Sequence, residues 1–186
     1  MKRIITSLLL CLIGLTAYSQ EHMKFKGIEM NITTPKFAKK LLKDGYVQDY
    51  RQGDTFILKG NFAGYNAKIY LYPNNSKQIM YAAVTVDCLS WGHLKSVYDT
   101  FFELLTQKYG NPLLSSHTFK ESYSEGDGNE LTALRNGYVE WDDRWLFLEG
   151  KIFLQMSADV VGTPMVTLTY LDEINSNDDR NRSDDL

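Results

Sequence analysis

The feature that most constrains the fold is a helical pattern followed by strand patterns, and this combination occurs twice along the chain. Near residue 37 and again near residue 102, apolar side chains recur at spacings of three and four residues. Each of these segments is followed by short stretches that alternate apolar and polar residues. The first spacing indicates a helix and the second a strand with one buried face. We therefore predict an α+β fold made of two repeated units, each a helix packed on an antiparallel sheet meander.

The first unit begins with clear helix signals. Thr34 is the predicted N-cap, Pro35 occupies the first helical position, and Gly45 ends the helix. Strands are predicted to follow over residues 46–51, 55–62, 67–72 and 78–87. The second unit begins with a helix from about His93 to Tyr109, whose predicted buried face consists of Leu94, Val97, Tyr98, Phe101, Leu104 and Leu105. Its predicted strands cover residues 115–122, 138–148, 151–156 and 163–171, with a short helix over 129–136.

Two local matches in the same order link the halves. The helix segment 37–46 is similar to 102–110, and Lys68–Leu71 (KIYL), with a following strand that ends at Asp87, matches Lys151–Leu154 (KIFL), with a following strand that ends at Asp172. We therefore predict a duplication. The expected parts are a signal peptide over 1–19, a first helix-sheet repeat over 20–90, a second repeat over 91–172 with an insertion near 115–135, and an acidic tail over 173–186. The tail is predicted to be disordered because it has almost nothing to bury.

Residues 1–19 have the layout of a secretory signal. Lys2 and Arg3 precede a short apolar run, and small residues at Ala17 and Ser19 come just before polar Gln20. The run is too short to span a bilayer comfortably. Cys11 is preceded by Leu10, whereas a lipidated Cys needs a small residue before it. We therefore expect an exported protein, periplasmic or extracellular, without stable membrane insertion.

The remaining composition narrows the function classes. Removing residues 1–19 takes two of the 20 basic residues and none of the 23 acidic ones, which leaves a net charge of −5. An acidic chain argues against a nucleic-acid partner. Only Cys88 remains, so no intramolecular disulfide can form, and we expect a buried apolar thiol. The sequence predicts no cofactor and leaves the oligomeric state open.

The segment Met23–Met30, leading into the helix at Thr34 and Pro35, is similar to a set of uncharacterised exported Bacteroidetes proteins. The tandem order of helix and antiparallel sheet resembles the beta-lactamase-inhibitor-protein-like architecture and that of small outer-membrane lipoproteins. This resemblance covers most of residues 23–172. It implies a role in binding proteins, and it carries over no catalytic residue.

The strands indicate where such binding would occur. In each of three strands, one set of alternating residues is aliphatic and the other mixes aromatic, hydroxyl, amide and lysine side chains. The aliphatic sets are expected to lie under the helices, with Met80 among them and Ile79 in the mixed set. The mixed sets suit a half-hydrated binding face. The predicted contact residues are Tyr70, Tyr72, Tyr81 and Phe153. A competing interpretation is that these rings merely pair across strands or pack between the halves.

A second functional hypothesis uses carboxylates. Glu140, Asp142 and Asp143 lie beside Trp141 and Trp145, and paired carboxylates beside aromatic rings are typical of glycosidases. The alternative to a binding module is therefore a carbohydrate-active hydrolase or a sugar-binding protein. Alternation along a strand, with Asp143 facing away from the other two, favours an ordinary structural role. The sequence thus favours a non-enzymatic protein and leaves catalysis open.

Other groupings are weaker. Oxygen-bearing side chains between residues 125 and 130 do not have the spacing of an EF-hand, so a solvated loop is expected. Cys88 and His93 flank the start of the second helix without any further sign of a nucleophile site. The three histidines, His22, His93 and His117, fit no metal-binding motif.

Overall fold

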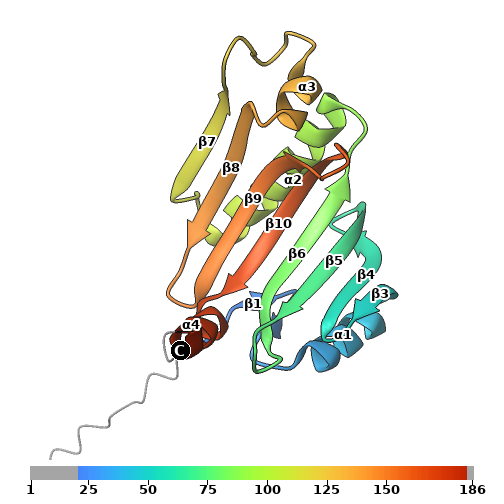
Figure 1. Cartoon of the computed structure of the whole chain (residues 1–186), viewed down its shortest axis with the longest axis vertical. Helices are drawn as coiled ribbons and strands as arrows, with labels where there is room; N and C mark the ends of the chain where they lie inside the picture. The colour runs from blue at the N-terminus through green and yellow to red at the C-terminus, as the bar shows by residue number, and fades with distance from the viewer. Residues whose placement is uncertain (1–20, 184–186) are drawn as a thin grey trace, which may run out of the picture.

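The computed structural model describes residues 21–183, with side chains through residue 178, so the predicted signal peptide lies outside the described residues. Its main element is an eight-stranded antiparallel sheet with helix α2 lying behind it (Figure 1). A separate two-stranded hairpin precedes the first helix. The predicted α+β class is confirmed.

Each half of the described chain begins with a helix and contributes four strands to the sheet, and the second half has an additional short helix between its first two strands. The first half consists of α1 (Thr34–Lys43), β3 (Val47–Gln52), β4 (Thr55–Phe62), β5 (Tyr65–Pro73) and β6 (Ile79–Asp87). The second half consists of α2 (Trp91–Tyr109), β7 (Leu114–Phe119), α3 (Glu130–Arg135), β8 (Val139–Leu146), β9 (Gly150–Ala158) and β10 (Pro164–Asp172). The hairpin of β1 (Lys24–Phe25) and β2 (Ile28–Glu29) comes first, and α4 (Glu173–Ser183) comes last.

The strand order is β3-β4-β5-β6-β10-β9-β8-β7, so the two meanders meet at the central pair of β6 and β10 (Figure 1). Helix α3 lies between β7 and β8 in the chain, whereas a tight turn joins β3 to β4. The common order of elements agrees with the predicted repeat, but the duplication itself stays a prediction.

The core lies between one face of the sheet and the helices α1 and α2. Both helices contribute buried apolar side chains to a single cluster that also contains the aliphatic residues of β4, β5, β6, β9 and β10. Phe25 of the hairpin reaches into this cluster, where its ring stacks on Phe62 and meets Tyr170 edge-on. The hairpin therefore helps to close the core, although the sequence patterns did not predict its two short strands.

The helix starts illustrate how local sequence is used. Ser90 caps α2, because its Oγ accepts a hydrogen bond from the backbone N–H of His93 at 3.1 Å. At α1 the N-cap is Thr33, one residue before the predicted Thr34. The side chain of Thr34 is buried and donates instead to the carbonyl of Lys77. The predicted cap was wrong because Thr34 binds the loop between β5 and β6.

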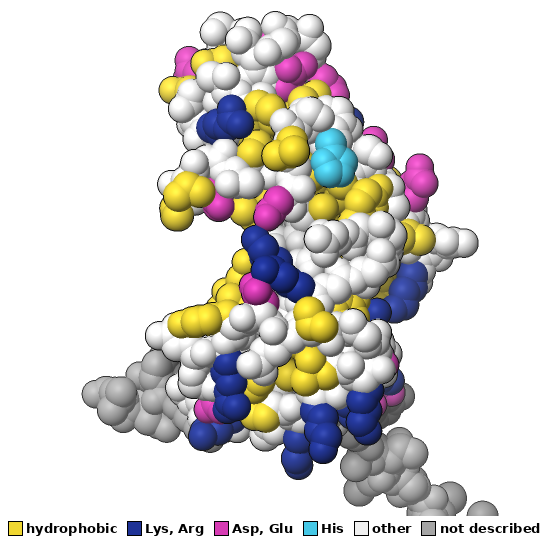
Figure 2. Space-filling model, turned by 90° about the vertical axis from the view of Figure 1, so that its right-hand side faces the viewer, with side chains coloured by type: hydrophobic (Ala, Val, Ile, Leu, Met, Phe, Trp, Pro, Cys, Tyr) yellow, Lys and Arg dark blue, Asp and Glu magenta, His cyan; other side chains and the backbone are white. Residues whose placement is uncertain are grey.

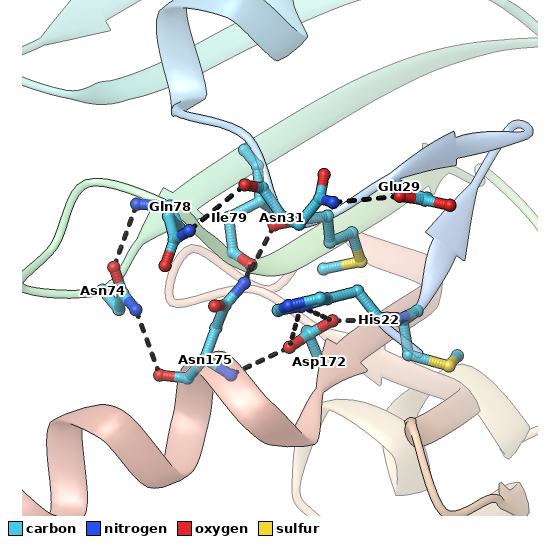
Figure 3. A network of polar contacts seen from close by, with 10 residues as sticks. His22, Glu29, Asn31, Asn74, Gln78, Ile79, Asp172 and Asn175 are labelled. Carbon is cyan, nitrogen blue, oxygen red and sulfur yellow. Dashed lines mark hydrogen bonds and ion pairs between the residues drawn. The ribbon is translucent and has the colours of Figure 1, made fainter. Parts of the chain in front are cut away.

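The predicted disorder after Asp172 was wrong for the start of the tail, where α4 forms. Asp172 is fully buried, and its Oδ1 accepts the backbone N–H of Asn175 at 2.8 Å, which caps the helix (Figure 3). Its Oδ2 accepts the backbone N–H of Met23 at 2.8 Å and lies 3.0 Å from Nδ1 of His22. The buried Asp172 carboxylate thus connects two segments that are distant in sequence. These contacts order a segment that composition alone predicts to be disordered.

Asn175 extends the same network to two further segments (Figure 3). Its Nδ2 donates to the carbonyl of Met30 at 2.9 Å and to that of Ile79 at 2.8 Å. Its own carbonyl accepts from Nδ2 of Asn74 at 3.2 Å. We call Asp172 and Asn175 the terminal clasp, since they join the N-terminal segment, the β5–β6 loop and α4.

A bulge reverses one part of the predicted side-chain alternation. The register between β5 and β6 shifts between Tyr72 and Pro73, so that Tyr72 pairs with Tyr81 while Pro73 pairs with Ile79. Met80 is therefore the extra residue. Ile79 is fully buried, and Met80 is half-buried. The predicted placement of Met80 under the helices and Ile79 on the open face was wrong for this reason.

Candidate binding face

One row of side chains crosses the whole sheet on the face opposite α1 and α2. Each residue of this row pairs directly with the next, from the first edge strand to the last. Seven steps of about 4.8 Å give the row a length of about 34 Å. We call it the central row, and it consists of Tyr50, Ile57, Tyr70, Ala83, Thr169, Phe153, Arg144 and Leu114.

All four predicted contact residues lie on this face. Tyr70 and Phe153 belong to the central row, where Ala83 and Thr169 separate them. Tyr72 and Tyr81 form the neighbouring cross-strand pair. Their side chains alternate with the buried aliphatic residues of the same strands, as the period of two requires.

The tyrosines form one compact group, and Phe153 stands apart from it. The rings of Tyr70 and Tyr72 are parallel, with centroids 6.3 Å apart. Tyr72 is 41% exposed even so. Partial burial and the neighbouring Tyr70 phenol raise the pKa of Tyr72 above its ordinary value. The hydroxyl of Tyr72 therefore remains a neutral donor and acceptor at neutral pH.

Tyr72 and Tyr81 border an open, mainly apolar hollow of about 540 Å³. The smaller residues Ala83 and Thr169 line it together with the larger Tyr72, Tyr81 and Met80. The Met80 side chain reaches this hollow because of the bulge between β5 and β6. Large rings beside smaller residues give the face a site into which a protruding side chain of a partner fits.

Ion pairs run beside the apolar rows. Lys68 Nζ lies 3.0 Å from Asp87 Oδ2, and Lys59 Nζ lies 2.7 Å from Asp49 Oδ1. The Asp87 carboxylate, as hydrogen-bond partner, raises the pKa of Lys68. In Figure 2, where the open face lies at the left, basic and acidic side chains lie together at the hollowed waist of the molecule. An apolar centre beside charged pairs is the arrangement found in protein interfaces.

The carboxylate hypothesis does not have the geometry that it requires. Trp141 and Trp145 are buried on the helix-covered face, where Trp145 Nε1 donates to the carbonyl of Gly110 at 2.8 Å. Glu140 and Asp142 lie on the open face. Strand β8 therefore places Glu140 and Asp142 on the side of the sheet opposite to the two tryptophans.

Both open-face carboxylates are also engaged by nearby cations. Lys120 Nζ lies 3.2 Å from Glu140 and, as its hydrogen-bond partner, lowers the pKa of that carboxyl. Asp142 accepts from Arg144 Nε at 2.6 Å. The general acid of a glycosidase is a carboxyl group with a raised pKa, whereas the pKa of Glu140 is lowered.

A polar cluster that the sequence did not reveal lies on the helix-covered face. Asp143 is fully buried, and its Oδ2 accepts the hydroxyl of Tyr98 at 2.7 Å and lies 3.0 Å from Nε2 of His117. The His117 ring stacks on Trp141, with centroids 4.7 Å apart. Tyr98, His117 and Asp143 come from α2, β7 and β8, so only the alternation that turns Asp143 inward gave any signal.

The Cys88–His93 pair and the acidic loop near residue 127 have structural roles and do not form sites. Cys88 is fully buried, which raises the pKa of its thiol to about 11, and His93 is exposed. Asp127 accepts backbone N–H groups of Ser124 and Asn129 within its own loop. Among the described residues, no group of three or more His, Cys, Asp or Glu side chains is placed to hold a metal ion.

Comparison of the chain with protein-family models, with curated proteins and with solved structures finds no match. In the part of the chain that the structure describes, none of the helices is both long and apolar enough to cross a membrane.

Proposed function

We propose that this chain is an exported, non-enzymatic binding module that presents its open sheet face to a protein or peptide partner. The observation that carries the proposal is the central row together with the tyrosines beside it. An uninterrupted row of side chains about 34 Å long, with aromatic rings around an apolar hollow, matches the dimensions and chemistry of a standard protein interface.

The charges of this face support the same function. Lys59 and Lys68 form ion pairs with Asp49 and Asp87 of the same molecule. Their charges are therefore neutralised at the border of the apolar centre and remain in contact with water. A partner would then be recognised mainly through apolar contact and shape. Tyrosine suits this use because its ring gives a large contact area for little lost conformational entropy.

The test is capture of a partner from the native envelope with wild-type protein and with the double variant Tyr70→Ala/Tyr81→Ala. We expect the variant to lose the partner that the wild type retains. The matched control is Tyr123→Ala/Tyr138→Ala, which removes two tyrosines whose rings stack with centroids 5.5 Å apart, outside the central row and its neighbouring tyrosine pair.

A photo-reactive amino acid at position 72 sharpens the result, because it must form a covalent link to the captured protein if the face is the contact surface. The same group at position 123 must not. Equal capture by wild type and by the Tyr70/Tyr81 variant would refute the proposal, as would cross-linking from position 123 alone.

A further inference from the structure

A second pocket lies on the other side of the sheet and is independent of the open face. It has a volume of about 260 Å³. Its floor consists of buried apolar side chains, Phe101 and Leu105 of α2 and Leu168 and Tyr170 of β10. The tips of the β1–β2 and β4–β5 hairpins complete its walls. Four elements that are distant in sequence thus line one open, mainly apolar pocket.

Leu104 is an exposed apolar residue on the wall of this pocket. The helical spacing places Leu104 among the predicted buried residues of α2, yet it is 48% exposed at the pocket. That part of the predicted α2 face was wrong, because no described side chain covers this position. A large apolar side chain on the wall of an apolar space is a surface that a ligand would cover.

Both hairpin tips at the pocket carry backbone strain. Lys26 has φ +50° and Ala63 has φ +51°, and each is followed by a glycine that also has positive φ. Two-residue turns of this kind favour Asn or Gly at the first position, where a side chain with an ordinary Cβ is disfavoured. Strained residues of this sort concentrate at ligand sites. Here two of them converge on one pocket.

The border of the pocket is basic. Lys26 and Lys108 both line it, and no Asp or Glu does. The ammonium group of Lys26 lies 5.0 Å from the centroid of the Tyr46 ring, and that of Lys108 lies 4.7 Å from the Tyr109 ring. Within the described residues, neither lysine forms an ion pair with a carboxylate, in contrast to Lys59 and Lys68.

From these observations we infer that this pocket binds a single-chain amphiphile with a carboxylate head, a medium-chain fatty acid. The apolar floor accepts the hydrocarbon chain, and the two lysines face the anionic head at the opening. A space of 260 Å³ holds about nine groups of the size of a water molecule, which corresponds to a chain of about eight to ten carbons.

The experiment is isothermal titration of the purified chain with decanoate, decan-1-ol and decylammonium. Decanoate is expected to bind at least tenfold more tightly than decylammonium. Lys26→Gln/Lys108→Gln should weaken decanoate about tenfold and leave decan-1-ol within twofold. Lys36→Gln/Lys39→Gln is the matched control, since it removes two exposed lysines of α1, and it should change neither ligand.

A filled pocket is the second arm. Leu104→Trp places an indole at a half-exposed position, so the protein is expected to fold normally by circular dichroism and to lose binding of all three ligands. Tyr70→Ala/Tyr81→Ala should bind decanoate like the wild type, which separates this site from the open face. Equal affinity for decanoate and decylammonium, no detectable binding, or unchanged binding by Leu104→Trp would each overturn the inference.

Discussion

Tyr98 and Asp143 are joined by a 2.7 Å hydrogen bond in which the phenol donates to a carboxylate without exposed surface. The bond links α2 to β8 across the core. Burial, together with this carboxylate, raises the pKa of Tyr98, so the hydroxyl keeps its proton and remains a donor. The other carboxylate oxygen, Oδ1, accepts no hydrogen bond from the described residues. In the part of the chain that the structure describes, Tyr98 and His117 are therefore the two side-chain partners of Asp143.

Removing the Tyr98 hydroxyl should destabilise the protein by about 2–3 kcal/mol, because a buried carboxylate then loses one of its two partners. The change is Tyr98→Phe, measured by urea unfolding, with Tyr123→Phe as a control at a half-buried tyrosine. The double change Tyr98→Phe/Asp143→Leu should cost less than Tyr98→Phe alone, since it removes the buried carboxylate together with the hydroxyl that donates to it. An unchanged unfolding midpoint in Tyr98→Phe would contradict this account.

Loss of the terminal clasp should free both ends of the folded chain. Asn175→Ala removes the donors to the carbonyls of Met30 and Ile79 and should lower the free energy of unfolding by about 2–3 kcal/mol. Amide hydrogen exchange is expected to accelerate in β1, β2 and α4 before the central strands. Gln107→Ala, at an exposed amide side chain of α2, is the control. Uniform acceleration across the whole sheet would show that the clasp does not act locally.

The thiol of Cys88 should make stability fall at alkaline pH. Burial raises its pKa from 9.0 to about 11, so between pH 9 and 11 the folded state keeps a proton that the unfolded state releases. The folded state then binds more protons, and the free energy of unfolding decreases as pH rises through this window, by on the order of 2 kcal/mol. Denaturant titrations from pH 8 to 11 measure this. Cys88→Ala should show a flatter profile, and an identical slope in both proteins would argue against the assignment.

Alanine substitutions at two glycines, Gly150 and Gly92, should change the stability of the protein in opposite directions. A Cβ at Gly150 would overlap the carbonyl oxygen of Leu171 and the side chain of Met23, and backbone cannot easily move aside. Gly150→Ala should therefore destabilise by more than about 2 kcal/mol. Gly92, in the first turn of α2, has open space around it, so Gly92→Ala should stabilise by about 0.5–1 kcal/mol. Thermal unfolding of both variants measures these changes. A Gly150→Ala protein as stable as the wild type would show that the close contact at Gly150 can relax.

Patterns of short range predicted most of the fold. The alternation along β5 and β9 identified their buried faces, and Gly110, with φ +81°, follows α2 as the helix stop signal requires. These signals lie within a few residues of the structure that they specify. The open-face positions of Tyr70, Tyr72, Tyr81 and Phe153 follow from the same period of two.

What the sequence missed depends on partners that are distant along the chain. The helix after Asp172 forms because Asn175 binds backbone carbonyls near residues 30 and 79. Composition predicts disorder there because it contains no record of those partners. Likewise, a single bulge turns Ile79 inward and Met80 outward. No local sequence pattern predicts this bulge. The cluster of Tyr98, His117 and Asp143 is visible only once three elements are packed.

The sheet arrangement has a consequence for the order in which the chain acquires its structure. The side chains of His22 and Asp172 are separated by 150 positions, and the strand that unites the meanders, β10, is the last of the sheet. Contacts of such high contact order form slowly. A chain that emerges from a channel N-terminus first therefore cannot complete its core until residues 164–175 have also emerged. A truncation before residue 164 would leave β6 and β9 as unpaired edges, which is a template for aggregation.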